Sequence, residues 1–592
     1  MGQERRQLIT IAILGLLIGA GIGLVALTES MIAGACGERP TARTPFAAVQ
    51  LLFGGSAAGY VTPEGCEVPT VGIQLAAAGI VIAVLALVIS VTVAYVRWRH
   101  SDAGFVAELQ ARDGFADRRE LKKYLSAQAV LRSAPTLRPT LGREAKPEDV
   151  GWPVGKARGV DVYVSIEDSM VVEGAPRGGK GYRILIPAIL DWAGPLVTTS
   201  TTNDNLSATF RPRQKRGDVH VFDPQRLSGL SRTLRYSPIA GCEDPLVAAQ
   251  RSRAIINGTA LGSSSTNGEW ADASATVLSR LLHAAAIAGK GVDDLYSWGS
   301  SPGLARRAVG ILRSDGAPGW GDGLEAFLDG DPRLLSNQWF GVQAAVAPLA
   351  IPQIRDVLSP GGADAPFTPA EFLAGENTLY LLGSSSGSTA MGGFLSAMLD
   401  DVVEVARKRA LSSPGARLPI PLGLILDEIA NMFRWESLPR VMADGGGRGI
   451  CTLVVLQALS QAETSWSPAE AATIWSAATA KVLLGGGGDA DHLADIERLI
   501  GYRERSRTQR SWNTEQMGHS VSEQHERLPL MTVDELRRMP NGTGLLSYRN
   551  RRPVLLELEG WTQRRDGREI SDAKRDLERD QQAQFAAHAH DV

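Results

Sequence analysis

The sequence predicts an α/β fold with a parallel sheet, helices on both of its faces, an all-helical insertion and a preceding pair of membrane-spanning helices. Three observations predict it: two long uncharged apolar segments near the N-terminus, short apolar strands that alternate with helical patterns, and a glycine-rich loop between a strand and a helix. Hydrophobic residues make up 44% and charged residues 21% of the 592 residues, which is a globular composition. The formal net charge of −3 excludes a polybasic protein, and four cysteines exclude a cysteine-rich zinc protein.

The first hundred residues predict a membrane hairpin. Residues 8–28 and 68–96 contain no charged side chain, and each run exceeds the ~20 apolar residues that cross a bilayer core. We place the two spans at about residues 8–28 and 71–96. A signal peptide is the alternative for the first run and a buried helix for the second, but no convincing cleavage site follows the first run.

The charges beside the two spans predict their orientation. Arg5 and Arg6 precede the first span, and Arg97 and Arg99 follow the second. Because positive charge stays on the cytoplasmic side of a membrane, we expect a cell-membrane protein with both termini and its main body in the cytoplasm. Residues 29–70 then form one loop outside.

Two cysteines, Cys36 and Cys66, fall in that outside loop. An oxidising exterior would allow a disulfide between them, which would stabilise the fold by roughly 3–4 kcal/mol. Two free thiols are an equally acceptable interpretation, because the sequence carries no geometry.

The rest of the chain divides where its pattern changes. Prolines mark a juxtamembrane helix and linker over residues 101–158, in which a capping box at Asp117 opens a helix through Leu131. Helical spacing without a strand over residues 244–360 predicts an all-α insertion, which divides the α/β domain into residues 159–243 and 361–562. The predicted strands are residues 170–172, 196–199, 219–222, 379–382, 423–426, 452–456 and 482–484.

Three C-terminal segments lie outside this alternation. Residues 503–525 are polar and irregular, which predicts a mobile loop. Residues 545–558 predict a closing hairpin around Asn550. Residues 563–592 mix charges without an apolar stripe, so we expect a charged tail that is either a solvated helix or disordered.

A glycine-rich loop follows the strand at residues 170–172 and opens a helix over residues 182–192. Strand, loop and helix in this order form a phosphate cradle, in which backbone N–H groups converge on phosphate oxygens and Lys180 lies between the β- and γ-phosphates. Gly181 departs from the Ser or Thr that normally binds magnesium here, and a structural glycine turn is the alternative. The predicted nucleotide-binding residues are Gly174, Ala175, Pro176, Arg177, Gly178, Gly179, Lys180, Gly181 and Tyr182.

The apolar strand at residues 423–426 ends in two carboxylates, Asp427 and Glu428. At the carboxyl end of a parallel strand these side chains face the ligand crevice. We predict that Asp427 holds Mg²⁺ and that Glu428 orients and activates the attacking water. A phosphate loop upstream makes a chance occurrence of this pair improbable.

The next strand is flanked by two further candidates. Gln457 follows the strand at residues 452–456, where its amide is positioned to sense the γ-phosphate; an ordinary strand-terminal residue is the alternative. Arg448 lies among glycines before that strand, and we predict a flexible loop there. Arg448 is either a finger that reaches a neighbouring subunit's phosphate or a plain surface arginine.

Together these features resemble the TraG/TraD-type conjugative coupling proteins of type IV secretion. The resemblance covers nearly the whole chain, and residues 189–205 and 221–225 are similar to the actinobacterial branch. Glycine at position 181 is a familiar variant in such proteins. Lys180, Asp427, Glu428, Gln457 and Arg448 match the family's ATPase residues.

The resemblance implies a hexameric RecA-like P-loop NTPase on a membrane stem, with an all-α domain that faces the cytosol. Such a protein binds ATP and Mg²⁺ and pumps DNA through ATP hydrolysis. Its implied partners are DNA, a relaxase or relaxosome, and components of a type IV secretion channel. An FtsK/SpoIIIE-like double-stranded DNA translocase is the alternative, although the predicted tail is too short for the usual winged-helix reader.

Two basic runs are compatible with sequence-independent contacts to DNA phosphates in a ring channel. Solvated surface loops are an equally acceptable interpretation. The runs consist of Arg211, Arg213, Lys215 and Arg216, and of Arg503, Arg505, Arg507 and Arg510.

Overall fold

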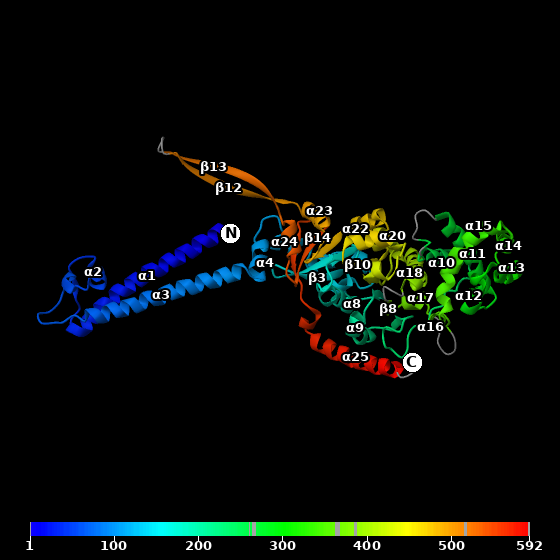
Figure 1. The fold of residues 1–592 in the computed structure, drawn as a ribbon, viewed down its shortest axis with the longest axis horizontal. Coiled ribbons are helices and arrows are strands. Elements are labelled where there is room, and N and C mark those ends of the chain that lie inside the picture. The colour runs from blue at the N-terminus through cyan, green and yellow to red at the C-terminus, as the bar shows by residue number, and fades with distance from the viewer. Residues whose placement is uncertain are drawn as a thin grey trace. The chain divides into compact units, whose positions relative to one another are not determined.

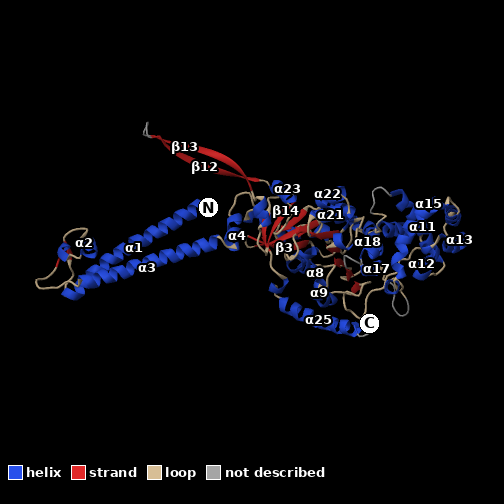
Figure 2. Cartoon of the chain, in the orientation of Figure 1, coloured by secondary structure: helices blue, strands red, loops and turns tan. Residues whose placement is uncertain are grey.

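A computed structural model describes residues 2–259, 261–262, 268–360, 367–383, 388–513 and 518–589. The chain forms two compact units, Met1–Arg112 and Asp113–Val592 (Figure 1). The first is almost entirely helical, whereas the second contains a large sheet with helices around it (Figure 2).

Two long helices, α1 (Gly2–Cys36) and α3 (Thr70–Arg99), pack against each other in the first unit. Within the part of the chain that the structure describes, Ile18–Cys36 and Thr70–Arg99 are long and apolar enough to cross a membrane. These stretches overlap the two predicted spans. A short helix, α4 (Asp102–Gln110), follows α3.

A small cap closes the loop between the two long helices. It contains α2 (Ala47–Gly54) and a two-stranded ribbon of β1 (Thr41–Ala42) and β2 (Tyr60–Val61). A disulfide joins Cys36 to Cys66, with a Cα–Cα distance of 5.5 Å. The core of the cap is apolar and is formed by Ile32, Ala47, Ala48, Leu51, Tyr60 and Ile73.

The second unit is built on an eleven-stranded sheet in the order β4-β3-β15-β14-β11-β5-β10-β9-β6-β8-β7. The strands from β11 to β7 are mutually parallel, and they are the seven strands that the sequence predicts. Their bounds are β5 (Met170–Glu173), β6 (Leu196–Ser200), β7 (Val219–Phe222), β8 (Thr378–Leu382), β9 (Leu422–Asp427), β10 (Ile450–Leu456) and β11 (Ala480–Leu484).

The other end of the sheet is antiparallel. The predicted closing hairpin is β14 (Thr543–Tyr548) and β15 (Val554–Glu557). Its strand β15 pairs with β3 (Gly151–Ala157), and β3 pairs with β4 (Val160–Ser165). The predicted linker includes β3. The sheet therefore begins before residue 159, and Pro153 concealed the strand β3.

The parallel strands are buried on both faces, since helices cover each side of the sheet. In β5, Val171 faces one core, whereas Met170 and Val172 face the other. In β10, Val454 faces the same core as Val171, and Val455 faces the other core. This explains why the parallel strands read as continuous apolar runs instead of alternating patterns.

The insertion is all-α in the described part of residues 244–360, as predicted. Its helices are α10 (Pro245–Asn257), α11 (Gly268–Ile287), α12 (Val292–Ser300), α13 (Pro302–Asp315), α14 (Trp320–Leu328), α15 (Pro332–Val346) and α16 (Pro352–Val357). The predicted helical spacing is that of the buried face of α11, which includes Leu278, Leu281 and Leu282. The long helix α18 (Ser388–Leu411) returns the chain to the sheet and packs against α10.

The prediction of a mobile loop at residues 503–525 is wrong. This segment forms a hairpin of β12 (Tyr502–Asn513) and β13 (Gly518–Pro529) that projects as an orange ribbon in Figure 1. The sequence of both strands is mostly polar, so hydrophobic and polar residues do not alternate in the way that predicts a strand. Opposite charges face each other across the ladder instead, at Glu504–Arg527 and Arg505–Glu526.

Two helical predictions also need correction. The predicted helix from Asp117 to Leu131 breaks into α5 (Arg118–Tyr124) and α6 (Ala127–Leu131), where Ser126 caps the second helix. The tail forms α25 (Gly567–Ala589), which packs against α9 (Asp204–Gln214). The buried stripe of α25 is hard to see in the sequence. Its two large apolar side chains are Ile570 and Leu577, and the next buried side chain is the polar Gln581.

Candidate nucleotide-binding site

The predicted phosphate loop connects β5 to a π-helical turn at Gly181–Leu185, which continues into α8 (Ile186–Asp191). The backbone is left-handed at Arg177 (φ 62°) and Gly179 (φ 86°). A Cβ at Gly178 would lie 3.0 Å from the carbonyl oxygen of Ala175, so the loop favours glycine there. This tight turn between a strand and a helix has the form that the sequence predicts for a phosphate cradle.

Lys180 is buried at the end of this loop, with 8% of its surface exposed. Its Nζ donates hydrogen bonds to the carbonyl oxygens of Gly174 (2.6 Å) and Ala175 (3.1 Å). Burial lowers the pKa of Lys180, whereas the nearby charges of Asp427 and Glu428 raise it. The two carboxylates offset the effect of burial only in part, so the pKa of Lys180 stays below its ordinary value.

Asp427 ends β9, and its carboxylate accepts a hydrogen bond from Nδ2 of Asn205 at 2.9 Å. Burial, together with the charge of Glu428, raises the pKa of Asp427 to about 7. Two adjacent, half-buried carboxylates therefore share a site in which a bound cation would be stabilised.

Glu428 has a left-handed backbone (φ 49°) that turns the chain away from β9. Gln457 Nε2 donates to one carboxylate oxygen of Glu428 at 2.7 Å, and the Thr201 hydroxyl donates to the other. Because β10 lies between β5 and β9 in the sheet, Gln457 stands between the phosphate loop and the carboxylate pair. The structure thus brings four predicted residues to one edge: Lys180, Asp427, Glu428 and Gln457.

Polar groups that were not among the predicted site residues hold these carboxylates. Thr199, Thr201 and Asn205 follow or end β6, the neighbour of β9, and Thr199 donates to the backbone carbonyl of Asp427 at 2.8 Å. The signal was present, because a polar run after a predicted parallel strand falls at the same edge as Asp427.

Arg448 does not lie on a flexible loop. It ends the helix α20 (Leu438–Arg448) and forms an ion pair with Asp444 at 2.9 Å. The glycines serve close packing: a Cβ at Gly446 would lie 1.9 Å from the carbonyl oxygen of Glu167. The action of Arg448 on a neighbouring subunit stays a prediction.

One residue of the first basic run is excluded from DNA contact. Arg213 is fully buried, and its guanidinium donates to the carbonyl oxygens of Trp192 (2.6 Å), Gly194 (3.1 Å) and Glu376 (3.0 Å). The prediction that Arg213 contacts DNA is wrong, because its guanidinium already donates to these buried backbone carbonyls. Arg216 is half-buried and pairs with Glu376 at 2.9 Å.

The other cations of that run, Arg211 and Lys215, are more exposed and face the tail helix α25. Arg211 pairs with Asp580 at 3.3 Å, and Lys215 pairs with Glu569. In the second run, Arg505 is exposed on β12. The backbones of Arg503, Arg507 and Arg510 are also in β12, but the side chains of Arg507 and Arg510 lie outside the described residues. A role of this run in DNA binding stays a prediction.

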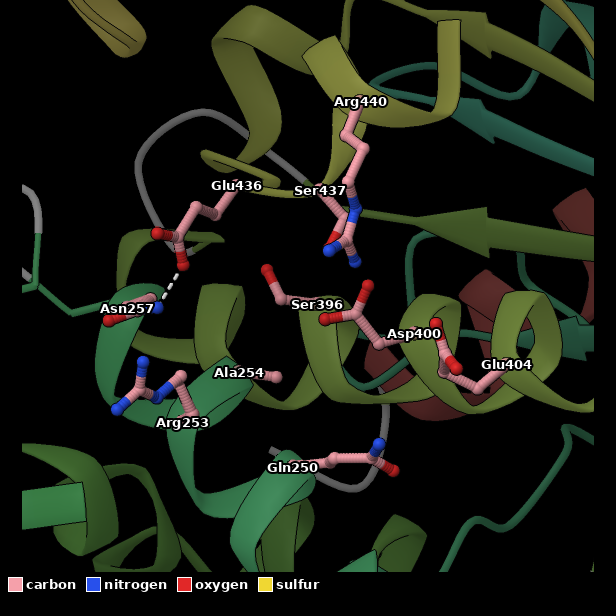
Figure 3. A pocket seen from close by; sticks show the side chains of 10 residues that line it. All are labelled: Gln250, Arg253, Ala254, Asn257, Ser396, Asp400, Glu404, Glu436, Ser437 and Arg440. Atoms are coloured by element: carbon pink, nitrogen blue, oxygen red, sulfur yellow. Dashed lines mark hydrogen bonds between the residues drawn. The ribbon is translucent and has the colours of Figure 1, made fainter. Parts of the chain in front are cut away.

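A separate cavity of about 370 Å³ lies where α10 meets α18 and the start of α20 (Figure 3). Asp400 and Glu404 line one side, and Arg253 and Arg440 contribute positive charge. Burial raises the pKa of Asp400 to about 6, although Trp435 Nε1 donates to it at 2.8 Å. None of the residues that line this cavity belongs to the phosphate loop.

Two family models match the chain in the order expected of one architecture. Residues 122–244 match the model described as "Type IV secretory system Conjugative DNA transfer", and residues 421–541 match "TraM recognition site of TraD and TraG". Both matches support a TraG/TraD-type coupling protein. The matched ranges contain Lys180, Asp427, Glu428 and Gln457, so the site described above lies within the family's own segments.

Solved structures of a coupling protein share the fold. A trigonal form of "Bacterial conjugative coupling protein TrwBdeltaN70" in complex with sulphate is 18% identical, with a TM-score of 0.53 over 74% of this chain and 92% of that chain. The unbound monoclinic form is 19% identical, with a TM-score of 0.52 over 69% and 88%. "Plasmid coupling protein TrwB in complex with ADP and Mg2+" is 18% identical, with a TM-score of 0.52 over 69% and 88%. No curated protein matches the chain.

These comparisons support two predictions from the sequence: a TraG/TraD-type coupling protein, and the RecA-like α/β fold.

Proposed function

We propose that this coupling protein is a membrane-anchored ATPase that links a relaxase–DNA substrate to a type IV secretion channel and moves the DNA by hydrolysing ATP. The observation that carries the proposal is the convergence of Lys180, Asp427, Glu428 and Gln457 at the carboxyl edge of the parallel strands. The conjugative-transfer family models favour this function over an FtsK/SpoIIIE-like translocase.

The phosphate loop binds the triphosphate. Backbone N–H groups of its glycines point at phosphate oxygens, and the start of the following helix adds a favourable dipole. Lys180 exchanges its two carbonyl partners for the β- and γ-phosphates and neutralises the charge that develops during transfer. Its burial strengthens this interaction, because water is excluded.

Glu428 is the general base for the attacking water. Gln457 and Thr201 each donate to one of its oxygens, which fixes the carboxylate and leaves its remaining lone pairs for the water. Since Gln457 bonds Glu428 directly, loss of the γ-phosphate would release a side chain at the end of β10. That coupling provides a route from hydrolysis to movement of neighbouring elements.

The residues present fit Mg²⁺. Asp427 and Glu428 place two carboxylates beside a single ammonium, Lys180, and burial disfavours the negative charge of Asp427. Within the described residues no group of three or more His, Cys, Asp or Glu side chains could form a metal cage, which suits an ion held by one carboxylate, water and substrate phosphates. When bound, Mg²⁺ would neutralise phosphate charge, and Asp427 would hold it.

The wider assembly is part of the same proposal. TrwB has been crystallised with ADP and Mg²⁺ and with a non-hydrolysable ATP analogue, which supports ATP and Mg²⁺ as ligands here. We propose a hexameric ring with Arg448 at the subunit boundary, and α1 and α3 as spans with both termini in the cytoplasm. The partners are sequence-independent DNA, a relaxase or relaxosome, and channel components.

The deciding experiment measures ATP hydrolysis by the full-length protein together with DNA transfer between cells. Glu428→Gln should bind ATP normally but lose turnover by about 10²- to 10⁴-fold, because the amide cannot accept a proton. DNA transfer should fall with it. Glu463→Gln, which changes an exposed carboxylate on α21 (Leu459–Ser465), is the matched control and should keep both activities. Parental turnover by Glu428→Gln would overturn the assignment of the base.

A further inference from the structure

The site lacks a hydroxyl where a phosphate loop usually carries Ser or Thr, since position 181 is glycine. A Cβ built on Gly181 would lie 3.4 Å from Oδ1 of Asn205. The place of the missing side chain is thus adjacent to an amide oxygen supplied by another element, the first turn of α9.

Asn205 is held in one orientation. It is 3% exposed, and its Nδ2 donates to Oδ2 of Asp427 at 2.9 Å. Because Nδ2 faces the carboxylate, Oδ1 faces the glycine. The backbone oxygen of Asn205 accepts a hydrogen bond from Thr209 at 2.6 Å, which fixes the turn itself.

We infer that Asn205 supplies the oxygen ligand for the divalent cation that Gly181 cannot supply. An amide oxygen is a hard ligand of the kind that Mg²⁺ accepts, and Asn205 already contacts Asp427, the carboxylate proposed to hold the ion. The inference rests on the proposed function and adds a residue to the cation side of the site.

The test is Mn²⁺ binding to the purified full-length protein with ADP, followed by electron paramagnetic resonance. Asn205→Ala should weaken Mn²⁺ binding by roughly 10- to 100-fold, while ADP binding in EDTA stays at the parental level. Gly181→Ser combined with Asn205→Ala should recover the affinity, because the serine hydroxyl occupies the vacated space. Asn203→Ala, which removes a nearby side chain that bonds the carbonyl of Leu227, is the matched control.

Each outcome is informative. Unchanged Mn²⁺ affinity in Asn205→Ala would overturn the inference, as would a folded double variant that recovers nothing. If Asn205→Ala unfolds, Asn205→Ser keeps an oxygen and should bind Mn²⁺ better than Asn205→Val. A parental protein that fails to bind ADP would contradict the proposed function instead.

A second, independent observation concerns the membrane unit. Helix α2 is apolar on both sides: Ala47, Ala48 and Leu51 are buried against the cap, whereas Phe46 at its N-cap and Phe53 are 68% and 87% exposed. With Val49, which is 49% exposed, these two rings share one face at the helical spacing of three and four residues. Apart from Gln50, the exposed face of α2 is apolar, and an apolar face needs a covering.

The height of α2 relative to the membrane is fixed by Gln74. Its Nε2 donates to the carbonyl oxygens of Leu51 and Leu52, both at 3.3 Å. Gln74 is the fifth residue of α3, and its neighbours Val71 and Leu75 are 67% and 70% exposed on that span. Figure 1 shows α2 beside the joined ends of α1 and α3.

The length of α3 places this level at the lipid headgroups. With Arg97 among the cytoplasmic headgroups, a hydrocarbon core of ~30 Å reaches back about 20 residues at 1.5 Å each, to about Ala77. Gln74 then lies about one helical turn beyond the core boundary. At the level where Gln74 holds α2, Val71 and Leu75 of α3 are also exposed.

We propose that α2 lies in the outer leaflet of the same membrane, with Phe46, Val49 and Phe53 among the lipid acyl chains. Such interfacial helices bury their apolar face about 5–10 Å into the headgroup boundary. The proposal rests on the membrane anchoring stated above, and it gives the cap a fixed depth in the bilayer.

Photocrosslinking of the full-length protein in nanodiscs of phosphatidylglycerol and phosphatidylethanolamine tests it. p-Benzoylphenylalanine replaces Phe53 in the test variant. It replaces Ile82 in the span as the positive control. The matched negative control replaces Phe340 on α15, which is 63% exposed. Lipid adducts should form at positions 53 and 82 and not at 340. Adducts at 82 with none at 53, or a crosslink from 53 to a second copy of the chain, would overturn the proposal. No adduct at 82 would contradict the anchoring itself.

Discussion

Two regions of the nucleotide-binding unit bring basic and acidic groups together, and the fold satisfies them differently. At the edge of the parallel strands, Lys180 is buried beside Asp427 and Glu428, and burial raises the pKa of Asp427 to about 7. On α9, Arg213 is equally buried, but backbone carbonyls take up its donors. Lys180 also donates to two carbonyls, but only the first region contains carboxylates, Asp427 and Glu428, whose charge a bound cation would compensate. Charge therefore indicates a binding site only where the fold leaves it uncompensated.

The largest expected effect is at the phosphate loop. Lys180→Ala should lower ATP turnover by about 10³-fold, because the ammonium that stabilises developing phosphate charge is lost. The melting temperature should hardly change. Lys215→Ala removes an equally basic residue from the α9 region, where it pairs on the surface with Glu569, and should leave turnover intact. Equal turnover in the two variants, measured with purified protein, would remove the distinction between the regions.

A comparable effect is expected at Arg448 if the ring is completed in trans. Arg448→Ala should bind ATP normally yet hydrolyse it about 10³-fold more slowly, by analogy with arginine fingers. Mixing it with Lys180→Ala should restore part of the activity, because some interfaces then pair an intact Lys180 with an intact Arg448. If mixed oligomers form without any recovery, Arg448 acts only through its own subunit, where it pairs with Asp444.

The opposite result is expected for Arg213. Arg213→Ala should lower the free energy of unfolding by about 3 kcal/mol or more, because several buried carbonyl groups lose their donor. Arg211→Ala should cost less than about 1 kcal/mol, since its ion pair with Asp580 is exposed. Thermal unfolding of the two variants measures the difference. Similar melting temperatures would show that the carbonyl groups find other partners.

Much of the fold was predictable, because the parallel strands are covered on both faces and therefore appear as short apolar runs. The strands β3 and β12 were not, since prolines and a two-sided polar surface hide their period. At the site, Lys180, Asp427, Glu428 and Gln457 follow from strand ends and loop composition. The polar run that contains Asn205 indicates the edge but not its contact with Asp427, and the burial of Arg213 is not predicted, because both depend on which strands become neighbours in the sheet.

The smallest expected effect concerns a third kind of charge pair, in which two buried side chains of opposite charge bond each other directly. Glu173, the last residue before the phosphate loop, accepts a hydrogen bond from Nε2 of His492 on α23 (Ala490–Ile500) at 2.6 Å. Burial lowers the pKa of His492, but the hydrogen bond and charge of Glu173, together with more distant acids, outweigh it, so the pKa is raised.

The sign of the pH dependence follows from that raised pKa. The stabilisation is fully present below the pKa of an unfolded histidine, about 6.5, and is lost as the pH rises through the higher pKa of the folded protein. His492→Gln should therefore lower the free energy of unfolding by about 1–3 kcal/mol at pH 5.5 and by less at pH 9. His525→Gln, on the exposed strand β13, should leave the pH profile parallel to that of the parent. A loss in His492→Gln that is the same at both pH values would mean that the histidine stabilises α23 through packing against Trp475 and not through its charge.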